Sequence, residues 1–352
     1  MRCIILAAGR FDDAHKRRIA EQLEPRLDVF ELERELAADV LDYRAVDASR
    51  SPAVKLAGRL GGPSAALAVI GFQARAKYDA FFTTGEDIGL PLAALMKTAR
   101  SKSSHTMIAH TLFPQKKRVF FKLGVGSQLD QVLVYSTSEE KLATEVLKLP
   151  PSHVQRLYYH ADEQFFRPGL ATIEPDLICA AGQLLRDYDC LVDAVRDLPV
   201  RVQIAAGSPW IDKPLGPTQP LPGNVTWGKL DRHALRGLYA RAAIAVVPIK
   251  QNHYQTGIAT ILEMMAMGKC VIATRTLGQT DTIVDGKTGI YVPPGDPQAL
   301  RAAIQRMLDN PAQAAEIGAA ARRFIEENAG LDLFVKKTVA ALKTGDELRR
   351  AS

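Results

Sequence analysis

The run of residues from Tyr254 to Glu263 combines a glycine, polar side chains and a carboxylate in an order suited to phosphate and sugar chemistry. Gly257 allows a ligand to approach the backbone closely, and the apolar residues after it predict a buried helix. The free N–H groups and the positive dipole end at the start of such a helix are a natural seat for phosphate. Glu263 would lie inside this helix and would need hydrogen-bond donors, which ribose hydroxyls could supply.

Gln255 precedes Glu263 by eight residues. On a helix this separation is about 12 Å, near the length of a nucleotide-sugar from its ribose to its hexose. The sequence alone leaves another interpretation of Glu263 open, in which it is a surface glutamate or is paired with a core arginine.

Two further segments follow predicted strands and could meet the same ligand. Gly182 and Arg186 come directly after the strand expected at Leu177–Ala181, and Gly207-Ser208 follows a strand expected to end at Ala206. Ligands of doubly wound parallel sheets bind at the carboxyl ends of strands, which places Arg186 to meet a diphosphate. The alternative is a surface arginine in a loop.

The elements that position these residues alternate between short apolar strands and longer helices, which is typical of a parallel sheet covered on both faces. The alternation restarts after Phe165–Gly169, a segment that we interpret as a linker. We therefore predict an α/β fold with two Rossmann-like, doubly wound domains. They would span residues 1–168 and 169–330, and a C-terminal helix over 331–352 would pack back towards the first domain.

The expected strands are Cys3–Ala8, Asp79–Thr83, Met107–Ala109, Gln131–Tyr135, Leu177–Ala181, Val200–Ala206, Ile244–Val247, Cys270–Ala273 and a short one within Gly286–Tyr291. The expected helices are Asp13–Leu23, Gly89–Ala99, Asp189–Val195, Ala234–Ala243, Thr256–Met267, Pro297–Leu308 and Ala312–Asn328. A further helix is expected from the capping box Ser136–Glu139 through Leu147.

Composition excludes several classes of protein. The 352 residues are 47% hydrophobic and 24% charged, which is ordinary for a globular protein and excludes a disordered chain. The longest apolar run, near Ala65–Phe72, is far shorter than the roughly 20 residues of a membrane span. No signal-peptide pattern is visible, so we expect a cytoplasmic protein. The four scattered cysteines predict reduced thiols and no structural zinc site.

The net charge of +6 is unevenly distributed, because residues 51–128 hold eleven basic and three acidic residues. A basic face indicates an anionic partner, unless it is only solvated. Nucleic acid is disfavoured because few aromatic residues interleave with the cations. Residues 114–123 could rest on an anionic bilayer as a basic helix, placing the protein peripherally at the inner face of a membrane. We favour a helix that packs Phe120 and Leu123 inward.

Four motifs in the second half resemble the donor domain of retaining glycosyltransferases of family 4, also called group 1, which have the GT-B fold. They are Leu238–Ala242, Leu262–Thr274, Asp285–Gly289 and Val292–Pro297, within a resemblance that runs from about Leu177 to Phe324. The resemblance implies two Rossmann-like domains facing across a cleft. It also implies a metal-independent transfer of sugar, with retained configuration, from a nucleotide-diphosphate sugar to an acceptor hydroxyl.

In that family two glutamates separated by seven residues hold the donor. Glu263 matches the second, which binds ribose, whereas Gln255 occupies the first position and removes its charge. His110 matches a histidine that faces the donor sugar, and Gly9 matches a glycine loop near the acceptor. The resemblance therefore implies His110 and Gln255 as catalytic residues and Gly9 on the acceptor side. The donor-binding residues that we expect are Gly182, Arg186, Gly207, Lys229, Gln255, Thr256, Gly257, Ile258 and Glu263.

No cofactor is expected beyond the nucleotide-sugar co-substrate, for which a UDP-sugar is the default. The acceptor, whether small molecule, glycan or lipid-linked sugar, is left open. So are two other functions: a sugar-nucleotide epimerase on the same fold, and a non-catalytic sugar-nucleotide-binding protein, for which Gln255 is the main indication. A nicotinamide dehydrogenase is disfavoured because no Gly-x-Gly-x-x-Gly follows a strand. A double-displacement glycosidase is disfavoured because no carboxylate pair is evident.

Overall fold

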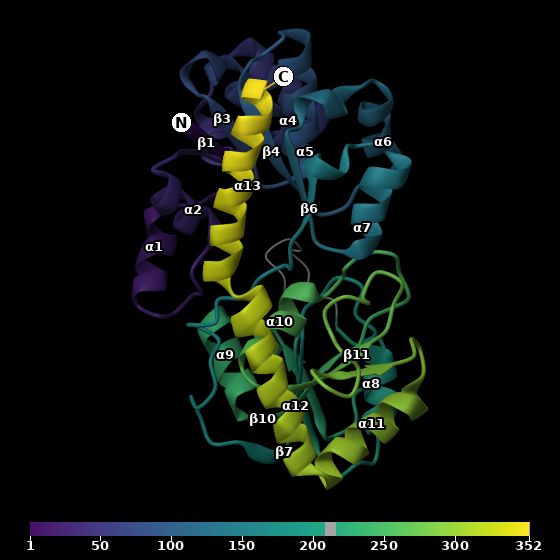
Figure 1. Ribbon diagram of the computed structural model, residues 1–352. Coiled ribbons are helices and arrows are strands. Elements are labelled where there is room, and N and C mark those ends of the chain that lie inside the picture. The colour runs from purple at the N-terminus through teal and green to yellow at the C-terminus, as the bar shows by residue number, and fades with distance from the viewer. Residues whose placement is uncertain (208–215, 352) are drawn as a thin grey trace. The chain divides into compact units, whose positions relative to one another are not determined.

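The computed structural model describes residues 1–207 and 216–351, and the chain divides into two compact units (Figure 1). Unit 1 comprises Met1–Lys16, Leu27–Leu157 and Phe334–Ser352, and unit 2 comprises Arg17–Arg26 and Tyr158–Leu333. Each unit contains one six-stranded sheet in which every strand pair is parallel. The α/β class with two doubly wound sheets is therefore confirmed.

Unit 1 has the strand order β2-β1-β3-β4-β5-β6. Its strands are β1 (Cys3–Leu6), β2 (Asp39–Leu41), β3 (Ala80–Thr83), β4 (Ser104–Ala109), β5 (Gln131–Val134) and β6 (Val154–Arg156). Helix α1 (Asp13–Ala20) begins in unit 1 and ends in unit 2, and most of α13 (Leu331–Ala351) belongs to unit 1. The other α-helices of unit 1 are α2 (Asp28–Leu36), α3 (Tyr43–Ala48), α4 (Pro52–Ala74), α5 (Glu86–Thr98), α6 (Gln115–Lys122) and α7 (Thr137–Lys141). Shorter helical turns lie at Arg75–Lys77, Val125–Gln128, Leu142–Val146 and Pro151–His153.

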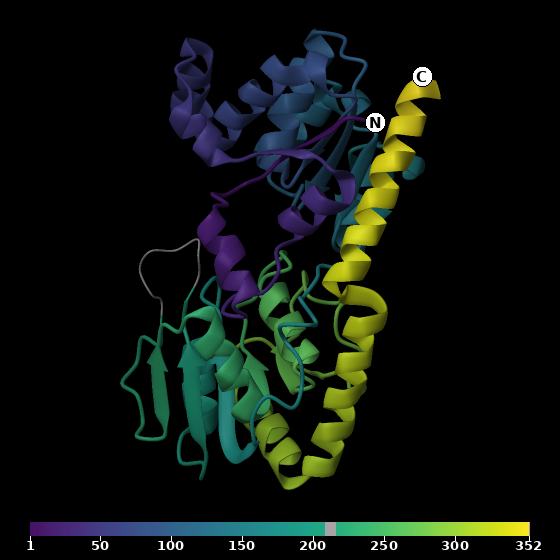
Figure 2. The same ribbon diagram turned by 90° about the vertical axis from the view of Figure 1, so that its left-hand side faces the viewer.

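Unit 2 has the strand order β12-β11-β10-β7-β8-β9. Its strands are β7 (Glu174–Ala181), β8 (Arg201–Ala205), β9 (Val225–Gly228), β10 (Ala242–Val247), β11 (Cys270–Thr274) and β12 (Ile290–Val292). The helices are α8 (Tyr188–Val195), α9 (Arg232–Arg241), α10 (Ile258–Ala266), α11 (Pro297–Asp309) and α12 (Pro311–Phe324), followed by a turn at Ile325–Ala329. The arrowheads of the teal and green strands of unit 2 point the same way in Figure 2.

The central strand β7 shows why unit 2 is covered on both faces. Cys179 and Ala181 pack into a core with residues of α9 and α10, whereas Ile178 and Ala180 pack into a second core with residues of α8 and α11. Successive side chains of a strand point to opposite faces, so a continuously apolar strand requires helices on each side. In the described part of the chain, no helix has both the length and the apolar composition needed to cross a membrane.

The structure departs from the expected linker at Phe165–Gly169. Phe165 and Phe166 are 3% and 1% exposed and belong to the core of unit 2, where the ring of Phe166 lies 6.1 Å from that of Tyr239. Unit 2 accordingly begins at Tyr158, about ten residues before the expected boundary. Helices α2 to α4 and strands β2, β6 and β9 were not predicted from the sequence.

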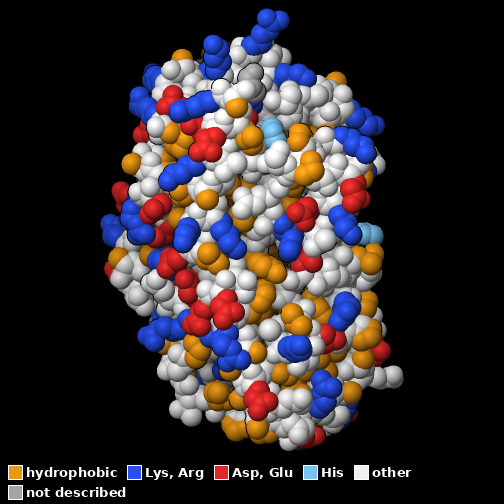
Figure 3. Space-filling model, viewed as in Figure 1, with side chains coloured by type: hydrophobic (Ala, Val, Ile, Leu, Met, Phe, Trp, Pro, Cys, Tyr) orange, Lys and Arg blue, Asp and Glu red, His pale blue; other side chains and the backbone are white. Residues whose placement is uncertain are grey.

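The basic segment 114–123 forms helix α6, but its packing differs from the expectation. Phe120 packs against the core of unit 1, whereas Leu123 is 68% exposed, so the prediction that Leu123 packs inward was wrong. Lys117 is buried rather than solvated, because it pairs with Glu86 and Asp87. On the face seen in Figure 3, basic and acidic side chains are interspersed.

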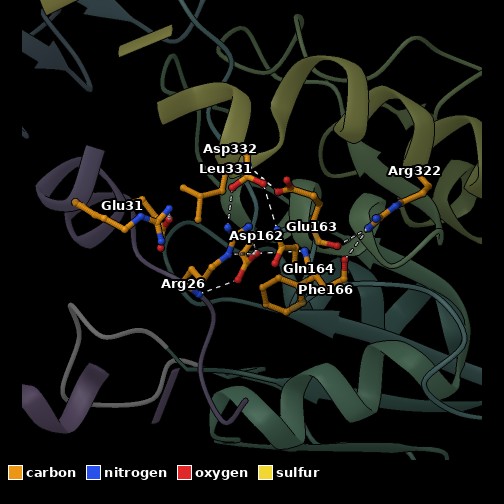
Figure 4. Close-up of polar contacts among 10 residues, drawn as sticks. Arg26, Glu31, Asp162, Glu163, Gln164, Phe166, Arg322, Leu331 and Asp332 are labelled. Atoms are coloured by element: carbon orange, nitrogen blue, oxygen red, sulfur yellow. Dashed lines mark hydrogen bonds and ion pairs between the residues drawn. The ribbon is translucent and has the colours of Figure 1, made fainter. Parts of the chain in front are cut away.

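Arg26 joins three segments of unit 2 that are far apart in the sequence (Figure 4). Its Nε and Nη2 donate to Oδ1 of Asp162 at 3.0 and 2.8 Å, and its backbone N–H donates to Oδ2 of the same carboxylate at 2.8 Å. Its Nη1 pairs with Asp332 at 2.6 Å. Nearby, Glu163 accepts the backbone N–H of Leu331 at 2.8 Å. These contacts attach the short N-terminal segment of unit 2 to the rest of that unit.

Replacing Arg26 by alanine should destabilise unit 2 by about 3 kcal/mol, because Asp162, whose side chain is 3% exposed, would be left buried without its cation. Arg201→Ala is the matched control, since Arg201 also bridges two carboxylates but is 55% exposed. We expect a much smaller loss there. Urea unfolding followed by tryptophan fluorescence measures both, and equal losses would contradict the role of the Arg26 pair.

Candidate active site

The strand order of unit 2 reverses between β7 and β10, and the loops that follow these two strands meet at the edge of the sheet. Arg186 follows β7 and Ile249 follows β10, and the two residues form an isolated antiparallel bridge. The crevice at such a reversal is where open α/β sheets bind ligands. The sequence prediction for Arg186 therefore coincides with the topological switch point.

The guanidinium of Arg186 is buried and held by neutral groups. Its Nε donates to the carbonyl of Ala181 at 2.9 Å, its Nη1 to the carbonyl of Leu184 at 3.1 Å, and its Nη2 to Oγ1 of Thr260 at 3.1 Å. Arg186 forms no ion pair with a carboxylate in the described residues, and burial lowers its pKa. A buried cation without an anionic partner can be neutralised by an anionic ligand.

Two glycines give the backbone room around this guanidinium. Gly182 has φ +92°, and a Cβ there would overlap the head group of Arg186. Gly257 has φ +83°, and a Cβ there would lie 3.0 Å from Nη1 of Arg186 and 3.2 Å from Cδ1 of Ile249. Both positions therefore combine a left-handed backbone with close approach, which explains glycine at each.

Helix α10 begins directly beside Arg186. Gly257 is its N-cap and provides no side-chain cap, so the first N–H groups of the helix have no partner within it. The loop before it is fixed: Oγ1 of Thr256 donates to Asn252 at 3.2 Å, and Nε2 of Gln279 donates to the carbonyl of Thr256 at 3.1 Å. The helix dipole and the guanidinium together make this corner attractive to a phosphate or diphosphate.

The expected helix Thr256–Met267 is thus shorter than predicted, because the left-handed Gly257 prevents it from starting before Ile258. Gln255 lies in the loop rather than on the helix, and it is partly buried. The separation of Gln255 from Glu263 is therefore not that of eight residues along one helix.

Glu263 lies on the buried face of α10 and already has donors from the protein. Arg232 donates from Nη1 to Oε1 at 2.9 Å, and the hydroxyl of Tyr239 donates to Oε2 at 3.3 Å. Burial raises the pKa of Glu263, and the charge of Arg232 opposes that rise only in part. Glu263 is thus paired with an arginine, but the Arg232 side chain is 40% exposed and does not belong to the core. Ribose binding by the remaining lone pairs of Glu263 stays a prediction.

Gly207 and Lys229 follow β8 and β9, farther along the same sheet edge. A Cβ on Gly207 would lie 3.4 Å from Cγ of Lys229, so the two residues are neighbours. Lys229 is exposed. Ser208, which was predicted together with Gly207, lies outside the described residues.

The two remaining predicted residues belong to unit 1. Gly9 follows β1 and accepts the backbone N–H of Tyr43 at 2.9 Å. His110 follows β4, is exposed, and its Nε2 lies 3.0 Å from the carbonyl oxygen of Thr84. A carbonyl can only accept, so Nε2 carries a proton and the neutral ring keeps its lone pair on Nδ1.

Sequence reasoning missed the residues that support these groups. Arg232, Tyr239 and Thr260 contact Glu263 or Arg186. Tyr239 and Thr260 lay within segments singled out beforehand, but neither was predicted to make these contacts. Arg232 carried no signal beyond its place at the start of a helix. Among the described residues, no group of three or more His, Cys, Asp or Glu side chains is arranged to hold a metal ion.

Residues 177–310, which include Arg186, Gln255 and Glu263, match the family model described as glycosyl transferases group 1. A glycogen synthase of Mycobacterium tuberculosis is 34% identical over 96 residues, which are 27% of this chain and 22% of that protein. A GDP-mannose-dependent alpha-(1-6)-phosphatidylinositol monomannoside mannosyltransferase of Mycolicibacterium smegmatis is 39% identical over 67 residues, 19% of this chain and 18% of that protein. The chain thus matches about a fifth of the length of these curated relatives.

Solved structures match over nearly the whole chain. Alr3699/HepE of Anabaena, solved in complex with UDP and glucose, has a TM-score of 0.68 at 13% identity and covers 97% of this chain and 99% of its own. Sucrose-phosphate synthase of Thermosynechococcus elongatus has a TM-score of 0.68 at 18% identity, with 100% of both chains covered. The fold is therefore the GT-B α/β fold that the sequence motifs implied.

Arg186→Met should weaken the binding of inorganic pyrophosphate about tenfold or more. A tenfold loss of affinity corresponds to about 1.4 kcal/mol of binding free energy. The same substitution should also lower the free energy of unfolding by about 1–3 kcal/mol, because two buried carbonyls lose their donor. Arg196→Met, at an exposed arginine of the same unit, is the control. Titration calorimetry measures the affinity. Unchanged pyrophosphate binding in a folded Arg186 variant would contradict an anion site at α10.

Proposed function

We propose that this protein is a retaining glycosyltransferase, which moves a sugar from a nucleotide-diphosphate sugar to an acceptor hydroxyl without a metal ion. Unit 2 would bind the donor, His110 of unit 1 would act on the donor sugar as a catalytic residue, and Gly9 of unit 1 would lie on the acceptor side. The observation that carries the proposal is the buried Arg186 beside the uncapped start of α10, within the region that matches glycosyl transferases group 1. A UDP-sugar is the first donor to test, because Alr3699/HepE was solved with UDP and glucose.

The chemistry follows from where charge develops. As the bond between the anomeric carbon and the diphosphate breaks, negative charge grows on the departing oxygen. The N–H groups at the start of α10 would stabilise this charge together with the positive charge of Arg186, whose guanidinium is held in place by Ala181, Leu184 and Thr260. The acceptor oxygen attacks from the face that the diphosphate leaves, its proton passes to the leaving oxygen, and the anomeric configuration is kept.

Glu263 and Gln255 would divide the remaining work. Glu263 is held in place by Arg232 and Tyr239, and its carboxylate would accept the ribose hydroxyls. Gln255 precedes the helix start and would hydrogen-bond the donor sugar as a neutral group. Because Gln255 lacks charge, a protein that binds the donor without transferring its sugar is the second candidate function.

Gln255 distinguishes these two functions. In a transferase, Gln255→Ala should lower turnover about tenfold or more while the nucleotide affinity stays within about twofold, because the nucleotide is held by other residues. Gln255→Glu should be tolerated. Sugar transfer is followed by NMR, which also reports the anomeric configuration, and nucleotide binding by calorimetry. A wild type that transfers nothing from any donor, together with a Gln255→Glu variant that does, would establish the binding protein instead.

The nucleotide affinity should fall at low pH through Glu263. Its pKa is raised by burial, so protonation removes the charged acceptor at a higher pH than for an ordinary glutamate near about 4.3. Glu263→Gln should bind about 1–3 kcal/mol more weakly at neutral pH and should lack this step in its pH dependence. Calorimetric titration of both proteins between about pH 8 and about pH 5 gives the comparison. Parallel pH curves would contradict the role of the carboxylate.

A further inference from the structure

A buried cluster of charged side chains surrounds the turn that carries His110 in unit 1. Glu86 is the first residue of α5, Glu139 lies in the first turn of α7, and Lys117 lies on α6. The three residues are 3%, 5% and 7% exposed, which is rare for ionisable side chains unless they are paired. The proposed chemistry uses none of them, so their burial requires another reason.

The two carboxylates accept hydrogen bonds from the backbone N–H groups of the turn. Glu86 accepts the N–H of His110 at 2.8 Å and the N–H of Thr111 at 3.3 Å, and Glu139 accepts the N–H of Leu112 at 2.9 Å. Three consecutive N–H groups at the end of a central parallel strand are thereby satisfied by side chains of the two flanking helices. A turn held by charge-assisted hydrogen bonds at every donor has little freedom to rotate.

The positive charge of Lys117 balances the negative charge of the buried carboxylates. Its ammonium pairs with Glu86 and lies 3.4 Å from Asp87. Burial acts to lower the pKa of Lys117, but the neighbouring carboxylates outweigh it and the pKa is raised. Burial raises the pKa of Glu139, opposed by the Leu112 N–H and by Lys117. The cluster is thus a linked set in which removing one charge leaves another buried without its partner.

The turn fixes the ring of His110 as well as its backbone. Nε2 donates to the carbonyl of Thr84, the residue directly after β3, and the ring centroid lies 5.5 Å from that of Tyr135. Gly85 lies beside the ring, since a Cβ at this position would lie 3.8 Å from Cδ2 of His110, an ordinary contact distance. The ring can reach the Thr84 carbonyl only while the backbone at 110–112 keeps its present path.

We propose that Glu86, Glu139 and Lys117 are positioning residues for His110, which hold its Nε2–H on the Thr84 carbonyl and so present Nδ1 as the hydrogen-bond acceptor for a sugar hydroxyl. The inference rests on the proposed glycosyl transfer for the identity of that hydroxyl. The tautomer of the His110 ring does not depend on the proposed function, because the ring has that tautomer in the free protein. The cluster acts through His110 and touches no substrate itself.

The direct test is the tautomer of His110 in the free protein. In protein labelled with ¹⁵N-histidine, long-range ¹H–¹⁵N correlation spectra distinguish a neutral ring protonated on Nε2 from one protonated on Nδ1, and His110→Gln assigns the signal. We expect the Nε2–H form in the wild type. A neutral His110 protonated on Nδ1 would overturn the proposal without any variant.

The variants then test the cluster. Glu86→Gln and Lys117→Met should each give a mixture of tautomers at His110 and lower kcat about 10- to 100-fold, with KM for the donor within about twofold. The matched control is Lys116→Met, since Lys116 is the exposed neighbour of Lys117 on the same helix. Lys116→Met should change neither the tautomer of His110 nor kcat. The double variant should lose less than the product of the single losses, because neither Glu86 nor Lys117 is then left buried and charged without the other.

The outcomes separate this proposal from the proposed function. Folded Glu86 and Lys117 variants with the wild-type tautomer and the wild-type kcat would overturn the positioning role while leaving the transferase intact. If the wild type transfers no sugar, only the tautomer of His110 tests the positioning role. Loss of the Nε2–H form in the Glu86 and Lys117 variants, but not in Lys116→Met, then supports that role. If a variant does not fold, the wild-type spectrum remains decisive.

Discussion

The burial of the Arg186 guanidinium without an ion pair to any described carboxylate is the constraint on which the candidate site of unit 2 depends. A buried cation must have every N–H satisfied, and here the acceptors are two carbonyls of the loop after β7 and a hydroxyl of α10. That choice holds the loop against the helix, excludes a Cβ at Gly182 and Gly257, and leaves positive charge uncompensated at the helix start. The proposed anion site would be a consequence of how the arginine is packed.

The two units use the same strand-end geometry for opposite purposes. In unit 2, no side chain of the described residues caps the start of α10, and the Arg186 guanidinium donates to Thr260 in the first turn of that helix. In unit 1 the N–H groups after β4 are closed by Glu86 and Glu139, so that edge offers no free donors at this turn. One sheet edge is thereby prepared for an anionic ligand, and the other is made rigid around a histidine.

Both sites depend on residues whose charge is balanced inside the protein. Glu263 is held by Arg232 and Tyr239, as Glu86 is held by Lys117. Such pairs add little net stability compared with apolar packing, but breaking one leaves an unpaired buried charge. Their value here is geometric, because a carboxylate fixed by a cation on a neighbouring helix presents its remaining lone pairs in one direction. The Arg26 pair shows the same principle in a purely structural place.

The sequence by itself determined the alternation of strands and helices, the two parallel sheets, the capping serine at Ser136 and the motifs of the donor half, because these features follow from local periodicity and from residues close together in the chain. It also pointed to Arg186, Glu263 and His110. Only the tertiary structure decided what those side chains contact. Arg232 meets Glu263 across 31 residues, Glu86 meets His110 across 24, and Arg26 meets Asp162 across 136. Such pairings depend on how the strand order brings loops together, and they cannot be predicted from composition and residue spacing.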